Sequence, residues 1–340
     1  MKHVFFVHSH ITFILSKLII NKHVLLKKDI VFIVSRNYQN EELAFYDSIN
    51  FSQIHDELSK YYIKDFFKIY SYIEKIDHVI ESKIDNKEFI VYLPIVRHKL
   101  MQIIASHKNC ICVNIVEEGM TSYSDYFFND IDSNIFKRIG KFIFNNLFFL
   151  TKKRFFYIKP FELRYFNKNI SSKFYTISKL GFNGVKEEIV YLNFKEYNKK
   201  CNYDIDNNTP ILILEGAVEQ GNLSIDILEE AVDQMISSID YNKIYVKFHP
   251  VQSIETINLI NQIFKKYNKQ IIKIPKEISI ELLSLDKKLI IYGFSSSLLF
   301  YTKLFGSEVY SYEYLLLKDY KYKKFKKQFN FDIVNLLDKI

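Results

Sequence analysis

Two adjacent carboxylates, Glu117 and Glu118, stand at the end of an apolar run and are followed by Gly119. The run, CICVNIV at residues 110–116, has the composition of a buried strand. A carboxylate in this position can take the proton of a hydroxyl group within hydrogen-bond reach. A neighbouring carboxylate raises its proton affinity through like-charge repulsion. The triplet alone could also be an ordinary turn, so the rest of the chain must decide.

A histidine follows a second apolar run in the same way. KIYVKF at 243–248 is followed by His249 and Pro250. Held by the proline, the histidine can offer one ring nitrogen to an anion. Lys247 adds positive charge nearby, although strand alternation could point it away. The alternative for His249 is a capping role.

Three hydroxyl side chains follow a third apolar run. Ser295, Ser296 and Ser297 come after KLIIYGF and before the helical pattern LLFYTKLF. Hydroxyls beside the unpaired N–H groups of a helix N-terminus form a phosphate site. An ordinary N-cap is the alternative. Gly216 opens a further loop of this kind after ILILE.

These residues need a scaffold that brings strand ends together. Apolar runs alternate with helical patterns along both halves of the chain, which predicts parallel sheets covered on both faces. We therefore predict an α/β protein of two Rossmann-like, doubly wound domains facing a cleft, because ligands bind beyond the carboxyl ends of such strands. The predicted parts are an N-terminal domain (1–195), a polar linker (196–210), a C-terminal domain (211–315) and a basic helical segment (316–340) that can pack back on the N-terminal domain.

Composition excludes several classes of protein. The 340 residues, 48% hydrophobic and 25% charged, suit a globular protein of two domains. The eight glycines form neither a dinucleotide-binding nor a P-loop motif, and the three cysteines lack CxxC spacing. Two DxD triplets, at 130–132 and 204–206, lie in Asn-rich stretches and are interpreted as solvated turns. We predict no metal and no cofactor.

The net charge of +8 fits nucleic acid, a membrane surface or an anionic substrate as partner. Basic residues flank FIFNNLFFL and recur in the Lys-rich stretch 317–328. FIFNNLFFL is too short to span a membrane but suits its surface, unless it is a buried helix. We expect a cytoplasmic protein, peripheral on the inner face of the cytoplasmic membrane, with no nucleic-acid partner. A basic nucleic-acid-binding or non-catalytic protein is the alternative.

The order of EEG, HP and SSS resembles that of the bacterial sialyltransferases of the GT-B fold. This group includes lipooligosaccharide sialyltransferases, capsule polysialyltransferases and multifunctional marine-type enzymes. Their motifs are a D/E-D/E-G triplet in the N-terminal domain, then HP and a paired serine in the C-terminal domain. The segment IPKEISIELL looks like the family segment whose glutamate binds the cytidine ribose, and Glu281 matches it. The opening VFFVHSHITFIL is similar to the first strand and helix of the group.

The resemblance implies an inverting, metal-independent transfer of sialic acid from CMP-sialic acid to a hydroxyl of a surface glycan, lipooligosaccharide or capsule. It implies Glu117 as general base and a catalytic His249, with Glu118 and Gly119 in an orienting role. On the CMP and phosphate side it implies Lys247, His249, Pro250, Glu281, Ser295, Ser296, Ser297 and Gly216. On the acceptor side it implies His10 and Thr12. These motifs recognise CMP and phosphate, so a pseudaminic, legionaminic or Kdo donor is the alternative.

Overall fold

The computed structural model describes residues 1–59, 68–94, 98–123, 173–197, 201–329, 335 and 337–338. The chain divides into two compact units, Met1–Tyr197 and Asn198–Ile340. The described part of the predicted linker, 201–210, contains neither helix nor strand, and its Ile205 is buried.

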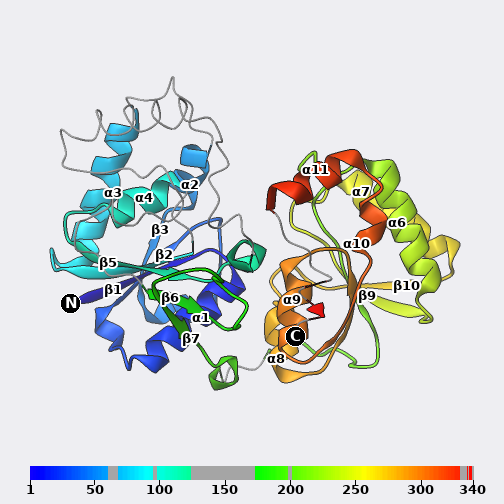
Figure 1. Cartoon of the computed structure of the whole chain (residues 1–340), viewed down its shortest axis with the longest axis horizontal. Helices are drawn as coiled ribbons and strands as arrows, with labels where there is room; N and C mark the ends of the chain where they lie inside the picture. The colour runs from blue at the N-terminus through cyan, green and yellow to red at the C-terminus, as the bar shows by residue number, and fades with distance from the viewer. Residues whose placement is uncertain are drawn as a thin grey trace. The chain divides into compact units, whose positions relative to one another are not determined.

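In the described part of the first unit, seven strands form one sheet in the order β3-β2-β1-β4-β5-β6-β7 (Figure 1). All neighbouring strands are parallel. The strands are β1 (Lys2–Val7), β2 (Ile30–Val34), β3 (Asp47–Asn50), β4 (Phe89–Leu93), β5 (Cys110–Val116), β6 (Lys173–Thr176) and β7 (Glu188–Tyr191). The central strands are apolar along almost their whole length because both faces of the sheet are covered.

Helices cover the two faces of this sheet. The helices are α1 (His10–Lys22), α2 (Ser52–Ser59), α3 (Lys68–Ile84) and α4 (Lys99–Ala105), with short 3₁₀ turns η1 (Lys27–Asp29), η2 (Glu41–Phe45), η4 (Gly119–Tyr123) and η8 (Phe194–Glu196). The helices α2, α3 and α4 share one core with the sheet, and α1 lies on the opposite face (Figure 1).

The second unit repeats the plan with five parallel strands in the order β10-β9-β8-β11-β12. The strands are β8 (Ile211–Ile213), β9 (Lys243–Lys247), β10 (Gln270–Lys273), β11 (Ile290–Gly293) and β12 (Glu308–Ser311). The helices are α6 (Ile225–Ser238), α7 (Ile254–Lys266), α8 (Ile280–Asp286), α9 (Ser297–Leu304), α10 (Glu313–Leu316) and α11 (Tyr320–Phe329). The predicted class, two doubly wound parallel α/β domains, is confirmed.

The basic C-terminal segment is integrated into the second unit. The fully buried Tyr322 of α11 belongs to the same core as residues of β8, β9, α6 and α7. The structure anchors α11 through Tyr322 to the C-terminal core; that the basic segment also packs back on the N-terminal domain stays a prediction. None of the described helices is long and apolar enough to cross a membrane.

The strand order reverses once in each sheet, between β1 and β4 and between β8 and β11. Ligands of doubly wound folds bind at such a switch point, beyond the carboxyl ends of the strands. The residues that follow β1, β2, β4 and β5, and those that follow β8, β9 and β11, are therefore the candidates for a site.

Candidate functional site

The two carboxylates after β5 have different environments. The Glu117 side chain is completely buried. It accepts hydrogen bonds from the Tyr123 hydroxyl, from Thr176 Oγ1 at 2.5 Å and from the Ile177 backbone N–H at 2.9 Å. Glu117 therefore ties η4 to the end of β6, and its oxygens are occupied within the protein.

Glu118 faces residues that follow β1 and β2. Its Oε1 lies 2.5 Å from His8 Nε2 and 3.5 Å from Arg36 Nη1, and its side chain is 19% exposed. Burial by itself would raise the pKa of Glu118, but the charge and hydrogen bond of His8 and the charge of Arg36 outweigh burial and lower it. Glu118 is thus a carboxylate, ionised at neutral pH, that a ligand can approach.

His8 follows β1, which borders the switch point, and Arg36 follows β2, the next strand in the sheet. The His8 side chain is 2% exposed, and within the described residues its Nδ1 is buried without a hydrogen-bond partner. Arg36 has φ of 54°, a left-handed conformation that is uncommon for a residue with a side chain. Such backbone conformations concentrate at functional sites.

Two further histidines adjoin this group. The rings of His55 on α2 and His98, the N-cap of α4, stack with centroids 4.0 Å apart. Burial, together with the nearby His55 and Arg36, lowers the pKa of His98 to about 4. Burial also lowers the pKa of His55, opposed by its hydrogen bond to Asp56. Both rings are therefore neutral at pH 7, and His98 uses both nitrogens within the protein, with the Leu100 N–H and the Ser59 hydroxyl.

Sequence reasoning included Glu118 only in a secondary role and missed His8, Arg36, His55 and His98. The signal for His8 was present, because it follows the apolar run VFFV directly, as His249 follows KIYVKF. The same rule applied to IVFIV leads to Ser35 and Arg36. His55 and His98 lie on helices, where no strand end marks them.

The predicted acceptor-side residues have local structural roles. The hydroxyl of Thr12, which is buried, forms a capping box with Ser9 at the start of α1. His10 packs edge-on against Tyr38 and hydrogen-bonds to its hydroxyl at 3.3 Å through Nδ1. Gly119 has φ of 54°, which lets the chain turn sharply after Glu118.

In the second unit, His249 and Gly216 lie against each other. A Cβ atom on Gly216 would lie 2.8 Å from His249 Nδ1 and 2.3 Å from a methyl of Val251, so only glycine permits this approach. His249 Nδ1 accepts the Val251 backbone N–H at 3.4 Å, which leaves Nε2 as the protonated nitrogen. Pro250, after it, is exposed.

Lys247 and Glu281 are linked through one loop. The Lys247 ammonium donates to the carbonyls of Pro275, Lys276 and Ile278 at 2.6, 3.0 and 2.7 Å, which uses all three of its protons. It therefore holds the loop that leads into α8 and is not available to a phosphate. In the first turn of α8, Glu281 Oε2 accepts the Ser279 hydroxyl at 2.8 Å.

The three serines after β11 divide into different roles. Ser295 donates its backbone N–H to Glu215, and its hydroxyl lies 2.5 Å from the Tyr322 hydroxyl. Ser296 is the N-cap of α9 and accepts the Leu298 N–H at 3.3 Å. Ser297 is the first residue of α9. Only Ser296 and Ser297 therefore stand at the helix terminus where an anion can bind.

Glu215, at the end of β8, is the carboxylate beside the second switch point. Burial raises its pKa to about 7; the Ser295 N–H opposes this rise and the neighbouring Glu313 adds to it. Sequence reasoning selected Gly216 from this loop and passed over Glu215.

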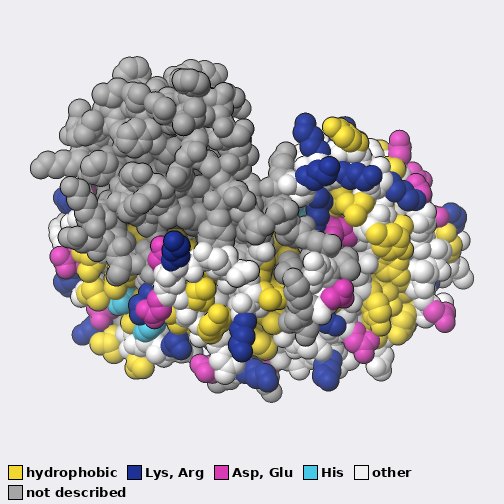
Figure 2. Space-filling model, viewed as in Figure 1, with side chains coloured by type: hydrophobic (Ala, Val, Ile, Leu, Met, Phe, Trp, Pro, Cys, Tyr) yellow, Lys and Arg dark blue, Asp and Glu magenta, His cyan; other side chains and the backbone are white. Residues whose placement is uncertain are grey.

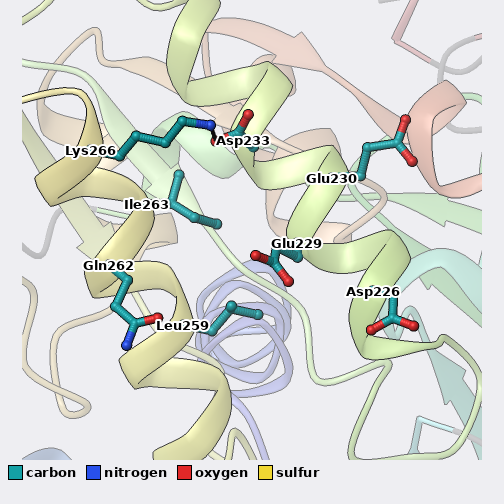
Figure 3. Close-up of a pocket in the computed structure, with 8 residues that line it drawn as sticks. All are labelled: Asp226, Glu229, Glu230, Asp233, Leu259, Gln262, Ile263 and Lys266. Atoms are coloured by element: carbon teal, nitrogen blue, oxygen red, sulfur yellow. Dashed lines mark hydrogen bonds and ion pairs between the residues drawn. The ribbon is translucent and has the colours of Figure 1, made fainter.

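A groove of about 380 Å³ lies between α6 and α7 in the second unit (Figure 3). Carboxylates of α6 line one side, and Lys266 of α7 pairs with Asp233 across it at 2.7 Å. An acidic groove on paired helices is a poor match for an anionic substrate.

Among the described residues, no three His, Cys, Asp or Glu side chains are grouped as a metal site requires. Asp206 accepts the Thr209 hydroxyl at 2.7 Å and the Asn208 N–H at 3.0 Å, so the 204–206 triplet belongs to a turn. The 130–132 triplet lies outside the described residues.

No family model and no curated protein matches the chain. Solved structures do resemble it. S. aureus MnaA with UDP has 12% identity and a TM-score of 0.52, over 91% of this chain and 78% of that one. The UDP-GlcNAc 2-epimerase of Methanocaldococcus jannaschii, in complex with UDP-GlcNAc and UDP, has 14% identity and a TM-score of 0.52, over 98% and 94%. A sialyltransferase from Photobacterium damsela has 14% identity and a TM-score of 0.48, over 88% and 71%.

The two likenesses at a TM-score of 0.52 agree with the two parallel sheets. The chain has the GT-B fold, built from two Rossmann-like domains.

Proposed function

We propose that the chain is a glycosyltransferase that moves a sugar from a CMP-activated donor, a sialic acid or a related nonulosonic acid, to a hydroxyl group of a glycan. The observation that carries the proposal is the contact between His8 and Glu118 at the carboxyl ends of β1 and β5. A carboxylate paired with an imidazole at the switch point is suited to deprotonate a hydroxyl group.

The resemblance to sialyltransferases implies Glu117 as the base, but its environment favours its neighbour. Glu117 is completely buried and accepts three hydrogen bonds from the protein. Glu118 instead contacts Nε2 of His8, and the other ring nitrogen of His8, Nδ1, is buried without a partner among the described residues. We assign the acceptor-activating function to this pair.

The second unit supplies groups suited to a nucleoside monophosphate. Of the two oxygens of Glu281, Oε2 is bonded to Ser279, which leaves Oε1 to accept a ribose hydroxyl. The Nε2–H of His249 and the α9 terminus at Ser296 and Ser297 are donors suited to the phosphate. Stabilising the leaving phosphate with such donors promotes cleavage of the sugar–phosphate bond.

A reaction on a UDP-sugar is the second candidate. The solved structures with a TM-score of 0.52 include a UDP-GlcNAc 2-epimerase in complex with UDP-GlcNAc and UDP. Epimerisation of a UDP-sugar needs no glycan acceptor, and this requirement separates it from the first candidate.

The test supplies the purified chain with CMP-sialic acid, CMP-Kdo or UDP-GlcNAc, each with and without a glycan panel. We expect CMP release that depends on the acceptor, and the same rate after EDTA treatment. Conversion of UDP-GlcNAc without acceptor, with both CMP-sugars intact, would favour the second candidate. A rate lost in EDTA and restored by Mg²⁺ would overturn metal independence.

A further inference from the structure

We infer that the imidazole of His8 takes the proton of the acceptor hydroxyl and that Glu118 is its positioning residue. The inference rests on the proposed function and names the proton acceptor within the pair. Three properties of His8 support it: the hydrogen bond of Nε2 to Glu118, the lack of a partner for Nδ1 among the described residues, and the position of His8 at the end of β1.

The contact with Glu118 fixes which nitrogen of His8 carries the proton. An ionised carboxylate can only accept hydrogen bonds. The 2.5 Å contact between His8 Nε2 and Glu118 Oε1 therefore places a proton on Nε2. In the neutral ring, Nδ1 then holds the lone pair, and Glu118 maintains this tautomer.

Nδ1 is the atom of His8 that needs a partner. The side chain is only 2% exposed, and Nδ1 is buried and accepts no hydrogen bond from the described residues. A buried polar atom without a partner costs ~1–3 kcal/mol, so its persistence indicates that a ligand or water supplies a donor. A sugar hydroxyl is such a donor.

The sheet puts a second polar atom in the same row. His8 follows Val7, which pairs with Val34, and Ser35 follows Val34. The Ser35 hydroxyl is likewise buried with no partner in the described chain. Two adjacent strands, of which β1 borders the switch point, are thus each followed by a polar atom that lacks a partner among the described residues.

The charges around the pair favour transfer to the imidazole. Glu118 Oε1 already faces both His8 and Arg36, and the hydrogen bond from His8 together with the charge of Arg36 makes the carboxylate a weaker base. Within the described residues, His55 on α2 also faces His8, and it is itself hydrogen-bonded to Asp56 and stacked on His98. Glu118 then stabilises the imidazolium that forms, in the manner of a histidine–carboxylate dyad.

The step balances without another reactant. The acceptor oxygen bonds to the anomeric carbon as the bond from that carbon to the CMP phosphate oxygen breaks. The bonding electrons leave with the phosphate, and the hydroxyl proton moves to Nδ1. Water then removes this proton and regenerates the neutral ring.

The first experiment compares His8→Ala, Glu118→Gln and His107→Gln in transfer from the donor that wild type consumes. His107 is the matched control: a buried histidine 3.8 Å from Glu81, but at the opposite end of β5. We expect His8→Ala to lower kcat by ~10²–10⁴-fold with donor KM unchanged, and added imidazole to restore part of it. Glu118→Gln should lose less, and His107→Gln should retain the wild-type rate.

The second experiment records the ¹⁵N NMR spectrum of the histidine-labelled wild-type chain at neutral pH. We expect His8 protonated on Nε2 and unprotonated on Nδ1. Protonation on Nδ1 would overturn the inference. Because this measurement uses the wild-type chain, it holds even if the variants fail to fold. If wild type transfers sugar and His8→Ala keeps its rate, the inference alone fails. If wild type consumes no CMP-sugar, the proposed function fails as well.

Discussion

At the scale of single residues, the two carboxylates of one triplet do different work. Glu117 connects η4 to β6 through three hydrogen bonds, whereas Glu118 faces His8 and Arg36. Adjacent residues at a strand end point to opposite faces, so a sequence motif alone leaves open which one reaches the ligand.

The first prediction follows from the burial of Glu117. Glu117→Gln places an amide against donors that now meet a carboxylate oxygen, so we expect a loss of ~1–3 kcal/mol in the free energy of unfolding. Its kcat should fall much less than that of Glu118→Gln. Urea unfolding and steady-state kinetics on both variants decide. The reverse order, with a stable but inactive Glu117→Gln, would return the base role to Glu117.

These residues also show what sequence can predict. The rule that ligands meet strand ends selected Glu117, Glu118, His249 and the serines as candidates, because each group follows an apolar run. It could not assign Lys247, whose ammonium meets carbonyls about thirty residues further along the chain. Nor could it find the His55–His98 stack, which depends on how α2 packs against α4.

At the scale of elements, Lys247 positions α8. Its ammonium crosses from β9 to three carbonyls of the loop before Glu281. Lys247→Met should release this loop and raise the donor KM, with kcat at saturating donor nearly unchanged. Lys243→Met is the matched control, because Lys243 is exposed at the start of the same strand. An unchanged donor KM in Lys247→Met would separate the loop from donor binding.

A second element-scale prediction concerns the junction of β8, β11 and α11. Burial raises the pKa of Glu215 to about 7 from its ordinary value of 4.5. Between these values the folded chain keeps a proton that the unfolded chain has released. Stability from this group is therefore present below about pH 4.5 and lost as pH rises to about 7, by up to ~3 kcal/mol.

Glu215→Gln removes this titration, so the variant should gain stability relative to wild type as pH rises from 4.5 to 7. Urea unfolding at several pH values measures the difference. The exposed Glu308 on β12 gives the control, Glu308→Gln, which should follow wild type. A constant difference between Glu215→Gln and wild type across this window would contradict the raised pKa.

At the scale of the whole molecule, the net charge of +8 raises the question of an external partner. Lys and Arg side chains gather over the part of the second unit where α11 lies (Figure 2). Within this stretch Lys318 pairs with Glu230, and the buried Lys326 pairs with Glu313. Four exposed lysines remain for an external partner: Lys321, Lys323, Lys324 and Lys327. The segment FIFNNLFFL, also predicted to meet a membrane, lies outside the described residues.

We propose that α11 contributes to peripheral contact with anionic lipid at the inner face of the cytoplasmic membrane. Each lysine near an anionic bilayer contributes ~1 kcal/mol, so changing the four exposed lysines to glutamine should abolish most sedimentation with anionic vesicles. Binding by wild type should fall as salt rises. Neutral vesicles are the control. The double variant Lys318→Gln, Lys326→Gln cannot serve as one, because it breaks the ion pairs with Glu230 and Glu313. Equal recovery with neutral and anionic vesicles would contradict the proposal.

The central claim is that the chain transfers a sugar from a CMP-activated donor through the His8–Glu118 pair. Its most direct test is the mass of a glycan acceptor after incubation with CMP-sialic acid and wild type, His8→Ala or Glu118→Gln. We expect wild type to add one or more sialic acid residues to the acceptor, and both variants to be slower, His8→Ala by ~10²–10⁴-fold. The claim would be contradicted if no acceptor of the glycan panel gained mass with any CMP-sugar while the chain turned over a UDP-sugar.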